Sequence, residues 1–87
     1  MKVVITPHAE EQIENRKLAR ERVIQIVSNP EEIISATSGR YFAQSKFVEG
    51  DKEYLLRVLF EDKDGERQVI TVYPTSRVKK YWKGGNL

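Results

Sequence analysis

The sequence lacks cysteine and has a single histidine, His8, among its 87 residues. Without cysteine the chain can form neither a disulfide nor a thiolate zinc site. One histidine and no spaced cluster of carboxylates leave no ligand set for a transition metal, so the sequence predicts no metal site and no cofactor. No apolar run approaches the ~18 residues that span a membrane. We therefore expect a soluble, cytoplasmic protein without a membrane partner.

The chain is short, and its charge is nearly balanced. Eighty-seven residues suffice for one hydrophobic core, so residues 1–87 are predicted to form a single domain. The 15 Lys and Arg residues outnumber the 13 Asp and Glu residues by two, a weak indication of a nucleic-acid partner. The stretch TSRVKKYWK, residues 75–83, has four basic residues, no acid, and Tyr81 beside Trp82. This composition is typical of phosphate contact with base stacking; the alternative is a solvated tail whose aromatic rings cover the core.

Two helices are predicted after a short first strand. Thr6 is a good N-cap and Pro7 fits the first helical position, so the first helix extends from there to about Arg16. The second helix lacks a good cap and ends at Asn29, because the residue before a proline avoids the helical region. The predicted first strand covers residues 2–5, and the second helix covers residues 20–28.

After Pro30 the hydrophobic period changes to two, which indicates strands. These strands are predicted at residues 31–37, 40–47, 54–61 and 67–74, with turns at 38–39 and 62–65. The order is therefore β-α-α-β-β-β-β. It predicts an α+β fold in which two N-terminal helices pack on one face of a mostly antiparallel sheet.

Alternation assigns a face to each residue of the last two strands. Leu56, Val58, Phe60, Ile70 and Val72 share the face that we expect to be buried beneath the helices. The opposite face carries Arg57, Thr71 and Tyr73.

The turn between these strands sets their register. A three-residue loop of Lys63, Asp64 and Gly65 would place Asp62 opposite Glu66. Arg57 would then lie opposite Thr71, and Leu55 opposite Tyr73. We favour this loop over a two-residue Asp64-Gly65 loop, because the shorter loop would break the matched faces.

Arg57 lies in mid-strand between leucines, so it needs an anion or an acceptor nearby. It either reaches solvent or a local carboxylate, or it binds the phosphate of an RNA. The strand at residues 40–47 has Arg40 and Lys46 on one side. If that side joins the Arg57 face, a basic, hydroxyl-bearing surface results that suits a phosphodiester backbone.

Several stretches resemble one known family: TPHAEEQIENR, VSNP, LRVLFE and VITVYPTSRVKKYW. The chain is similar to small, mostly bacterial domains of unknown function that are grouped with RelE/ParE-like toxins, in the fold shared by barnase, EndoU, colicin nucleases and RelE. Family members often show His-Ala-x-x-Arg with another arginine four residues on. The chain keeps His8, Ala9 and Arg16 but has Gln12 at the middle arginine. The resemblance implies a metal-independent ribonuclease, commonly a toxin that an antitoxin protein neutralises.

RNA cleavage requires a base, an acid and cations that stabilise the phosphorane charge. The catalytic candidates are His8, Arg57 and Tyr73. The RNA-binding candidates are Arg16, Arg40, Lys46, Thr71, Arg77, Lys79 and Lys80. The alternatives are a non-catalytic module that binds RNA or protein, as ParE-like relatives do, and an inactive toxin scaffold in which His8 only begins a helix. Clustering of the three catalytic candidates would favour an enzyme, and dispersal would favour binding.

Overall fold

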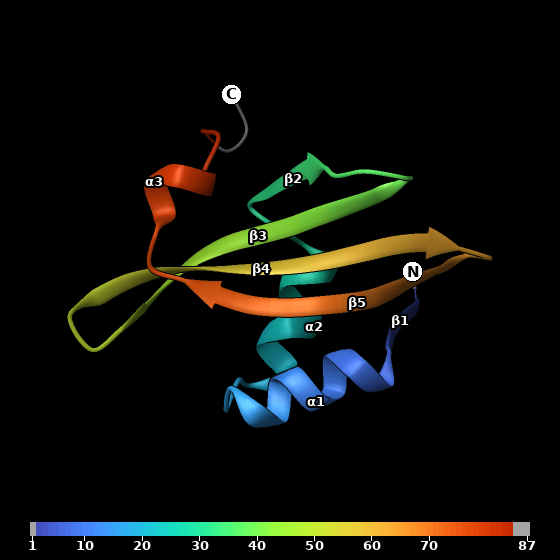
Figure 1. Ribbon diagram of the computed structural model, residues 1–87, viewed down its shortest axis with the longest axis horizontal. Coiled ribbons are helices and arrows are strands. Elements are labelled where there is room, and N and C mark those ends of the chain that lie inside the picture. The colour runs from blue at the N-terminus through green and yellow to red at the C-terminus, as the bar shows by residue number, and fades with distance from the viewer. Residues whose placement is uncertain (1, 85–87) are drawn as a thin grey trace.

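The structure has a helical layer on one face of a five-stranded sheet (Figure 1). It is a computed structural model that describes residues 2–84. The sheet order is β1-β5-β4-β3-β2, with β1 parallel to β5 and the other neighbours antiparallel. The predicted α+β class and element order are confirmed, and a one-turn helix follows the last strand. The elements are β1 (Lys2–Ile5), α1 (Pro7–Asn15), α2 (Arg20–Ser28), β2 (Glu32–Ser35), β3 (Arg40–Glu49), β4 (Lys52–Lys63), β5 (Glu66–Thr75) and α3 (Val78–Tyr81).

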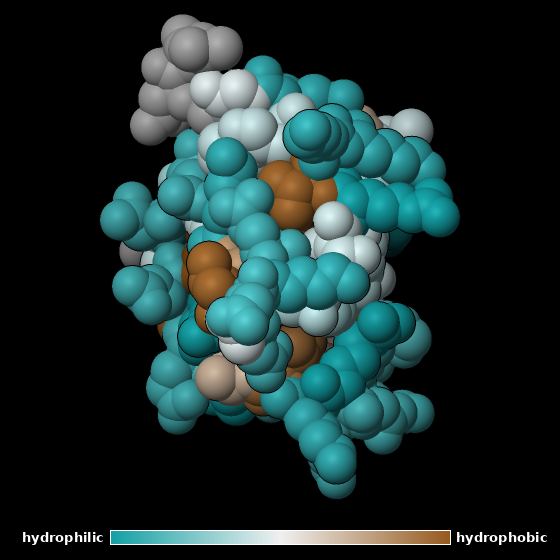
Figure 2. All heavy atoms as spheres, turned by 90° about the vertical axis from the view of Figure 1, so that its left-hand side faces the viewer, coloured by the Kyte–Doolittle hydropathy of each residue, from teal (hydrophilic) through white to brown (hydrophobic). Residues whose placement is uncertain are grey.

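The surface of the described chain is mostly polar. Figure 2 shows the end that carries α3 and the β3–β4 hairpin, where small hydrophobic areas lie between hydrophilic side chains. The large hydrophobic side chains that remain exposed among residues 2–84 are Ile33, Tyr41 and Val48. Within the same residues, no helix has the length and apolar character needed to cross a bilayer.

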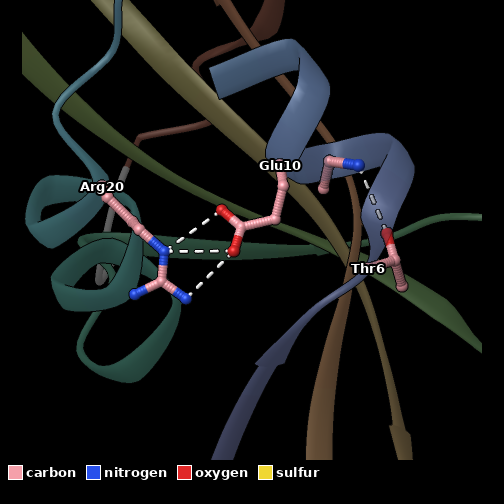
Figure 3. Close-up of polar contacts among 4 residues, drawn as sticks. Thr6, Glu10 and Arg20 are labelled. Atoms are coloured by element: carbon pink, nitrogen blue, oxygen red, sulfur yellow. Dashed lines mark hydrogen bonds and ion pairs between the residues drawn. The ribbon is translucent and has the colours of Figure 1, made fainter. Parts of the chain in front are cut away.

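Thr6 fixes the start of α1 and joins it to the sheet. Its Oγ1 accepts a hydrogen bond from the Ala9 backbone N–H at 3.4 Å, which caps the helix (Figure 3). The same hydroxyl donates to the Val69 carbonyl at 2.8 Å, and the Thr6 N–H donates to that carbonyl at 3.1 Å. The first turn of α1 is therefore anchored to the outer edge of β5.

An ion pair connects the two long helices. α2 begins after Ala19, which makes no side-chain cap, as the sequence predicted. Arg20, the first residue of α2, donates from Nε and Nη2 to the Glu10 carboxylate of α1, at 3.1–3.2 Å (Figure 3). The hydrogen bond and the charge of Glu10 raise the pKa of Arg20 further above its ordinary value.

The core lies between the helices and the sheet. Leu56, Val58, Phe60 and Val72 are buried there as predicted, but Ile70 is only half-buried, and Val69 takes its place. The helices and β3 complete the cluster with Ala9, Ile13, Val23, Ile26, Val27 and Ala43.

The predicted three-residue loop between β4 and β5 is wrong, and a bulge explains why the faces still match. Asp64 and Gly65 have φ of 54° and 75°, typical of a two-residue hairpin turn, and Lys63 pairs with Glu66. The register then shifts between Leu59 and Phe60, which leaves Ile70 as an extra residue in β5. As a result Arg57 pairs with Tyr73 and not Thr71, and Leu55 pairs with Thr75 and not Tyr73.

Gln12 protects the free part of the β5 edge. β1 covers this edge only as far as Val69, and beyond it the Val72 N–H donates to Gln12 Oε1 at 2.8 Å. Pro74 has no N–H to expose there. Gln12 therefore has a structural role.

Candidate functional site

Arg57 lies at the centre of the sheet face opposite the helices, with only 6% of its surface exposed. Its Nε donates to Gln44 Oε1 at 2.8 Å, and its Nη1 donates to Tyr73 Oη. Gln44 on β3 and Tyr73 on β5 are its direct cross-strand partners. The strand register thus sets three polar side chains in one row and fixes the orientation of the guanidinium.

Aromatic rings enclose the same guanidinium. The Arg57 Cζ lies 3.9 Å from the centroid of the Phe42 ring and 4.1 Å from that of Tyr81, with the Tyr73 ring at 5.6 Å. Phe42 and Tyr73 also meet edge to face, with centroids 6.3 Å apart. These cation–π contacts replace part of the hydration that the buried cation has lost.

Gln44 connects Arg57 to the buried carboxylate of Glu32. Its Nε2 donates to Glu32 Oε2 and, at 2.9 Å, to the Tyr81 carbonyl. Glu32 is 6% exposed and also accepts from the Lys83 N–H at 3.0 and 3.1 Å. Glu32, Gln44, Arg57 and Tyr73 form the polar cluster. The amide of Gln44 therefore stands between the positive and the negative side chain.

One nitrogen of Arg57 is left for another acceptor. Nη2 donates no hydrogen bond to any described residue. Within residues 2–84, we find no fully enclosed side-chain nitrogen or oxygen without a hydrogen-bond partner, among residues that are not themselves exposed. Nη2 must therefore retain contact with solvent, although the rest of Arg57 is buried. An oriented guanidinium N–H of this kind suits an anionic oxygen.

Other predicted RNA-binding residues share the face of the polar cluster. Thr71 is half-buried opposite Leu59, and Arg40 is exposed opposite Glu61. The ammonium of Lys46 lies 4.3 Å from the centroid of the Trp82 ring. The structure therefore brings Arg40, Lys46 and Thr71 onto one face with Arg57 and Tyr73.

His8 and Arg16 lie elsewhere. Both are exposed, His8 in the first turn of α1 and Arg16 at its C-terminal cap. α1 belongs to the helical layer, whereas the Arg57 side chain points from the other face of the sheet. The predicted cluster of His8 with Arg57 and Tyr73 is therefore not assembled, because the anchor of α1 at Val69 holds the histidine on the helical side.

The C-terminal segment covers part of the face that the sequence predicted to be open. Tyr81 and Trp82 are half-buried there, against Arg57 and Lys46 and not over the core, which the alternative interpretation predicts them to cover. The predicted basic residues of this segment surround an open hollow of about 410 Å³, lined by Glu53, Ser76, Arg77, Val78, Lys79 and Lys80.

The sequence analysis did not predict Glu32, Phe42 or Gln44 as site residues, and it named Tyr81 only as part of the basic C-terminal stretch. For Phe42 and Gln44 a signal exists, because they alternate with Lys46 on the side assigned to Arg57. Glu32 carries no such signal, and nothing in the sequence places Tyr81 against Arg57. Over residues 2–84 the structure contains no group of three or more His, Cys, Asp or Glu side chains arranged to hold a metal ion.

The fold and the polar cluster define an α+β domain with helices on one sheet face and a buried arginine on the other. The chain belongs to the family described as "Domain of unknown function (DUF4258)", whose model matches residues 5–74. The match therefore includes the central strands and ends before α3. No curated protein and no solved structure matches the chain in these comparisons.

Proposed function

We propose that the chain is a RelE/ParE-like, toxin-type protein that binds single-stranded RNA across the sheet face opposite the helices. The observation that carries this proposal is Arg57, a guanidinium held by two side chains, flanked by aromatic rings, with Nη2 open to solvent. Single-stranded RNA is recognised by cations that contact phosphate and by rings or guanidinium planes that stack on bases. Because Arg57 is already ordered, little conformational entropy is lost when an anion binds.

Basic residues around this face support the proposal. Arg40 and Lys46 lie on the face itself, and Arg77, Lys79 and Lys80 lie on or beside α3. Glu53 and Glu61 are close to these cations and reduce the local positive charge. We therefore expect a modest, salt-dependent contribution from the backbone phosphates, with Arg57 as the main contact.

A second function, metal-independent RNA cleavage, is favoured by one contact, the hydrogen bond from Arg57 to Tyr73. A phenol beside a fixed cation can exchange a proton while the guanidinium stabilises the phosphorane charge. In this version Tyr73, not His8, supplies the acid–base group, since His8 lies in the helical layer. The toxin resemblance further suggests a protein partner that neutralises the chain.

The proposal is tested by replacing Arg57 with lysine and measuring binding of a fluorescent single-stranded RNA of about 12 nucleotides by anisotropy. We expect at least about 10-fold weaker binding, because lysine cannot reproduce the planar, stacked, multidentate contact of arginine. Arg22→Lys is the matched control, since Arg22 also lies over a ring, that of Phe47 at 4.8 Å, but belongs to α2. Equal affinities for wild type and Arg57→Lys would contradict the proposal.

His8→Ala separates binding from the predicted His8 chemistry. The exposed position of His8 predicts a change of no more than about 0.5 kcal/mol in the free energy of unfolding. RNA affinity should stay within about twofold of wild type, because the substitution removes no contact with RNA. A tenfold change would require the loss of about 1.4 kcal/mol of binding free energy. RNA fragments separated on a gel would show whether cleavage occurs. A tenfold loss of affinity or of cleavage in His8→Ala would show that His8 belongs to the functional site.

A further inference from the structure

Phe42 and Tyr81, the two rings nearest the Arg57 guanidinium, belong to elements that differ in how extensively they are paired and packed. Phe42 belongs to β3, a ten-residue strand paired on both sides. Tyr81 belongs to α3, a four-residue helix that has no side-chain cap and no buried residue. One ring in contact with the guanidinium is therefore fixed on a paired strand, and the other belongs to a segment with little structure of its own.

Polar side chains hold this segment by its backbone. Gln44 Nε2 donates to the carbonyl of Tyr81, and the Glu32 carboxylate accepts from the N–H of Lys83. A carbonyl acceptor and an N–H donor are also what the edge of a nucleobase offers. The segment thus uses a stacking surface, an amide donor and a carboxylate acceptor that would equally suit a base.

We propose that the face of Arg57 now covered by Tyr81 is a stacking site for one base of a single-stranded RNA. Gln44 and Glu32 face the edge of that base, and Tyr81 occupies the site when no RNA is bound. This inference rests on the proposed function, because it assigns a base site to the same RNA-binding face. Guanidinium planes and aromatic rings stack on bases in the same manner, so Tyr81 and a base compete for one position.

Competition of this kind lowers the apparent affinity for RNA. Only molecules in which the Tyr81 ring has left Arg57 can accept the base, so the dissociation constant is raised by the reciprocal of that open fraction. Removing the ring should remove the part of this penalty that comes from stacking, while the backbone bonds of the segment to Gln44 and Glu32 remain. If Tyr81 instead acted as a platform for the RNA, its removal would weaken binding.

The test compares Tyr81→Ala with wild type on the same RNA of about 12 nucleotides, which we expect the variant to bind about 3- to 10-fold more tightly. Tyr41→Ala is the matched control, since Tyr41 is an exposed tyrosine that stacks on Phe60 on the helical face. It should leave the affinity unchanged. Adding Arg57→Lys to Tyr81→Ala should abolish the gain. Circular dichroism of each variant confirms that it is folded.

A second measurement reports stacking directly. An RNA that carries a 2-aminopurine base loses fluorescence when that base stacks, and Tyr81→Ala should quench it more strongly than Tyr81→Ala combined with Arg57→Lys. If Arg57→Lys weakens binding but Tyr81→Ala binds no more tightly than wild type, the base site is wrong and the proposed function stands. If neither wild type nor any variant binds RNA, both are wrong.

Discussion

Replacing Gln44 with leucine should lower the free energy of unfolding by about 3–5 kcal/mol, because it disconnects two buried ionic groups. Gln44 is fully buried, accepts from Arg57 and donates to Glu32 and to the Tyr81 carbonyl. Leucine has a similar volume, so the loss comes from hydrogen bonds and not from a cavity. Each buried group that loses its partner pays a desolvation cost, which is largest where the group is charged.

Urea denaturation measures this effect, as a shift of the midpoint at constant slope. Gln25→Leu is the matched control, because Gln25 is exposed on α2 and should change stability by no more than about 0.5 kcal/mol. A loss below about 1 kcal/mol for Gln44→Leu would mean that the three hydrogen bonds of Gln44 together contribute no more than one average neutral hydrogen bond. Arg57 would then be held mainly by its aromatic neighbours.

Replacing Phe60 with alanine should lower the free energy of unfolding by about 3–5 kcal/mol, through the cavity that it leaves. Phe60 is the largest fully buried side chain and stacks on Tyr41, with centroids 5.7 Å apart. The Arg67 guanidinium lies 4.2 Å from the centroid of the same Phe60 ring. Tyr41 and Arg67 belong to paired strands, which limits how far the surroundings can collapse into the space.

The matched control for Phe60→Ala is Ile33→Ala, since Ile33 is 48% exposed and buries much less apolar surface. Thermal unfolding followed by circular dichroism gives both values. At a temperature where the Phe60 variant remains folded, its RNA affinity should equal that of wild type, because Phe60 faces the helices. A stability loss below about 1 kcal/mol would show that the core repacks around the missing ring.

Much of the fold could be predicted because local signals agree with it. Thr6 and Pro7 mark the start of α1, and alternation along β4 separates Leu56 and Val58 from Arg57. The register of β5 could not be predicted correctly. The Asp64-Gly65 pair pointed to a two-residue turn, but only an added bulge reconciles that turn with the faces, and Ile70 carries no sequence mark of one.

The candidate site was predictable only where it depends on neighbouring strands. Arg57, Tyr73 and Lys46 follow from alternation and hairpin order. Glu32 and Tyr81 depend on where β2 and the C-terminal segment return to the sheet, which tertiary packing decides. The position of His8 relative to the site could not be predicted either. Its motif specifies a helix start but contains no information about which sheet face that helix covers.

The bulge in β5 also bears on how sequences of this family can differ in length. β5 contains one residue more than its pairing with β4 requires, since Leu59 and Phe60 are opposite Thr71 and Val69. A relative that lacks a residue at position 70 would form a regular ladder with the same Val69 and Val72 in the core. It would also keep the Arg57–Tyr73 pair. Alignments of family members should therefore permit a one-residue gap at this point without a change of fold or of site.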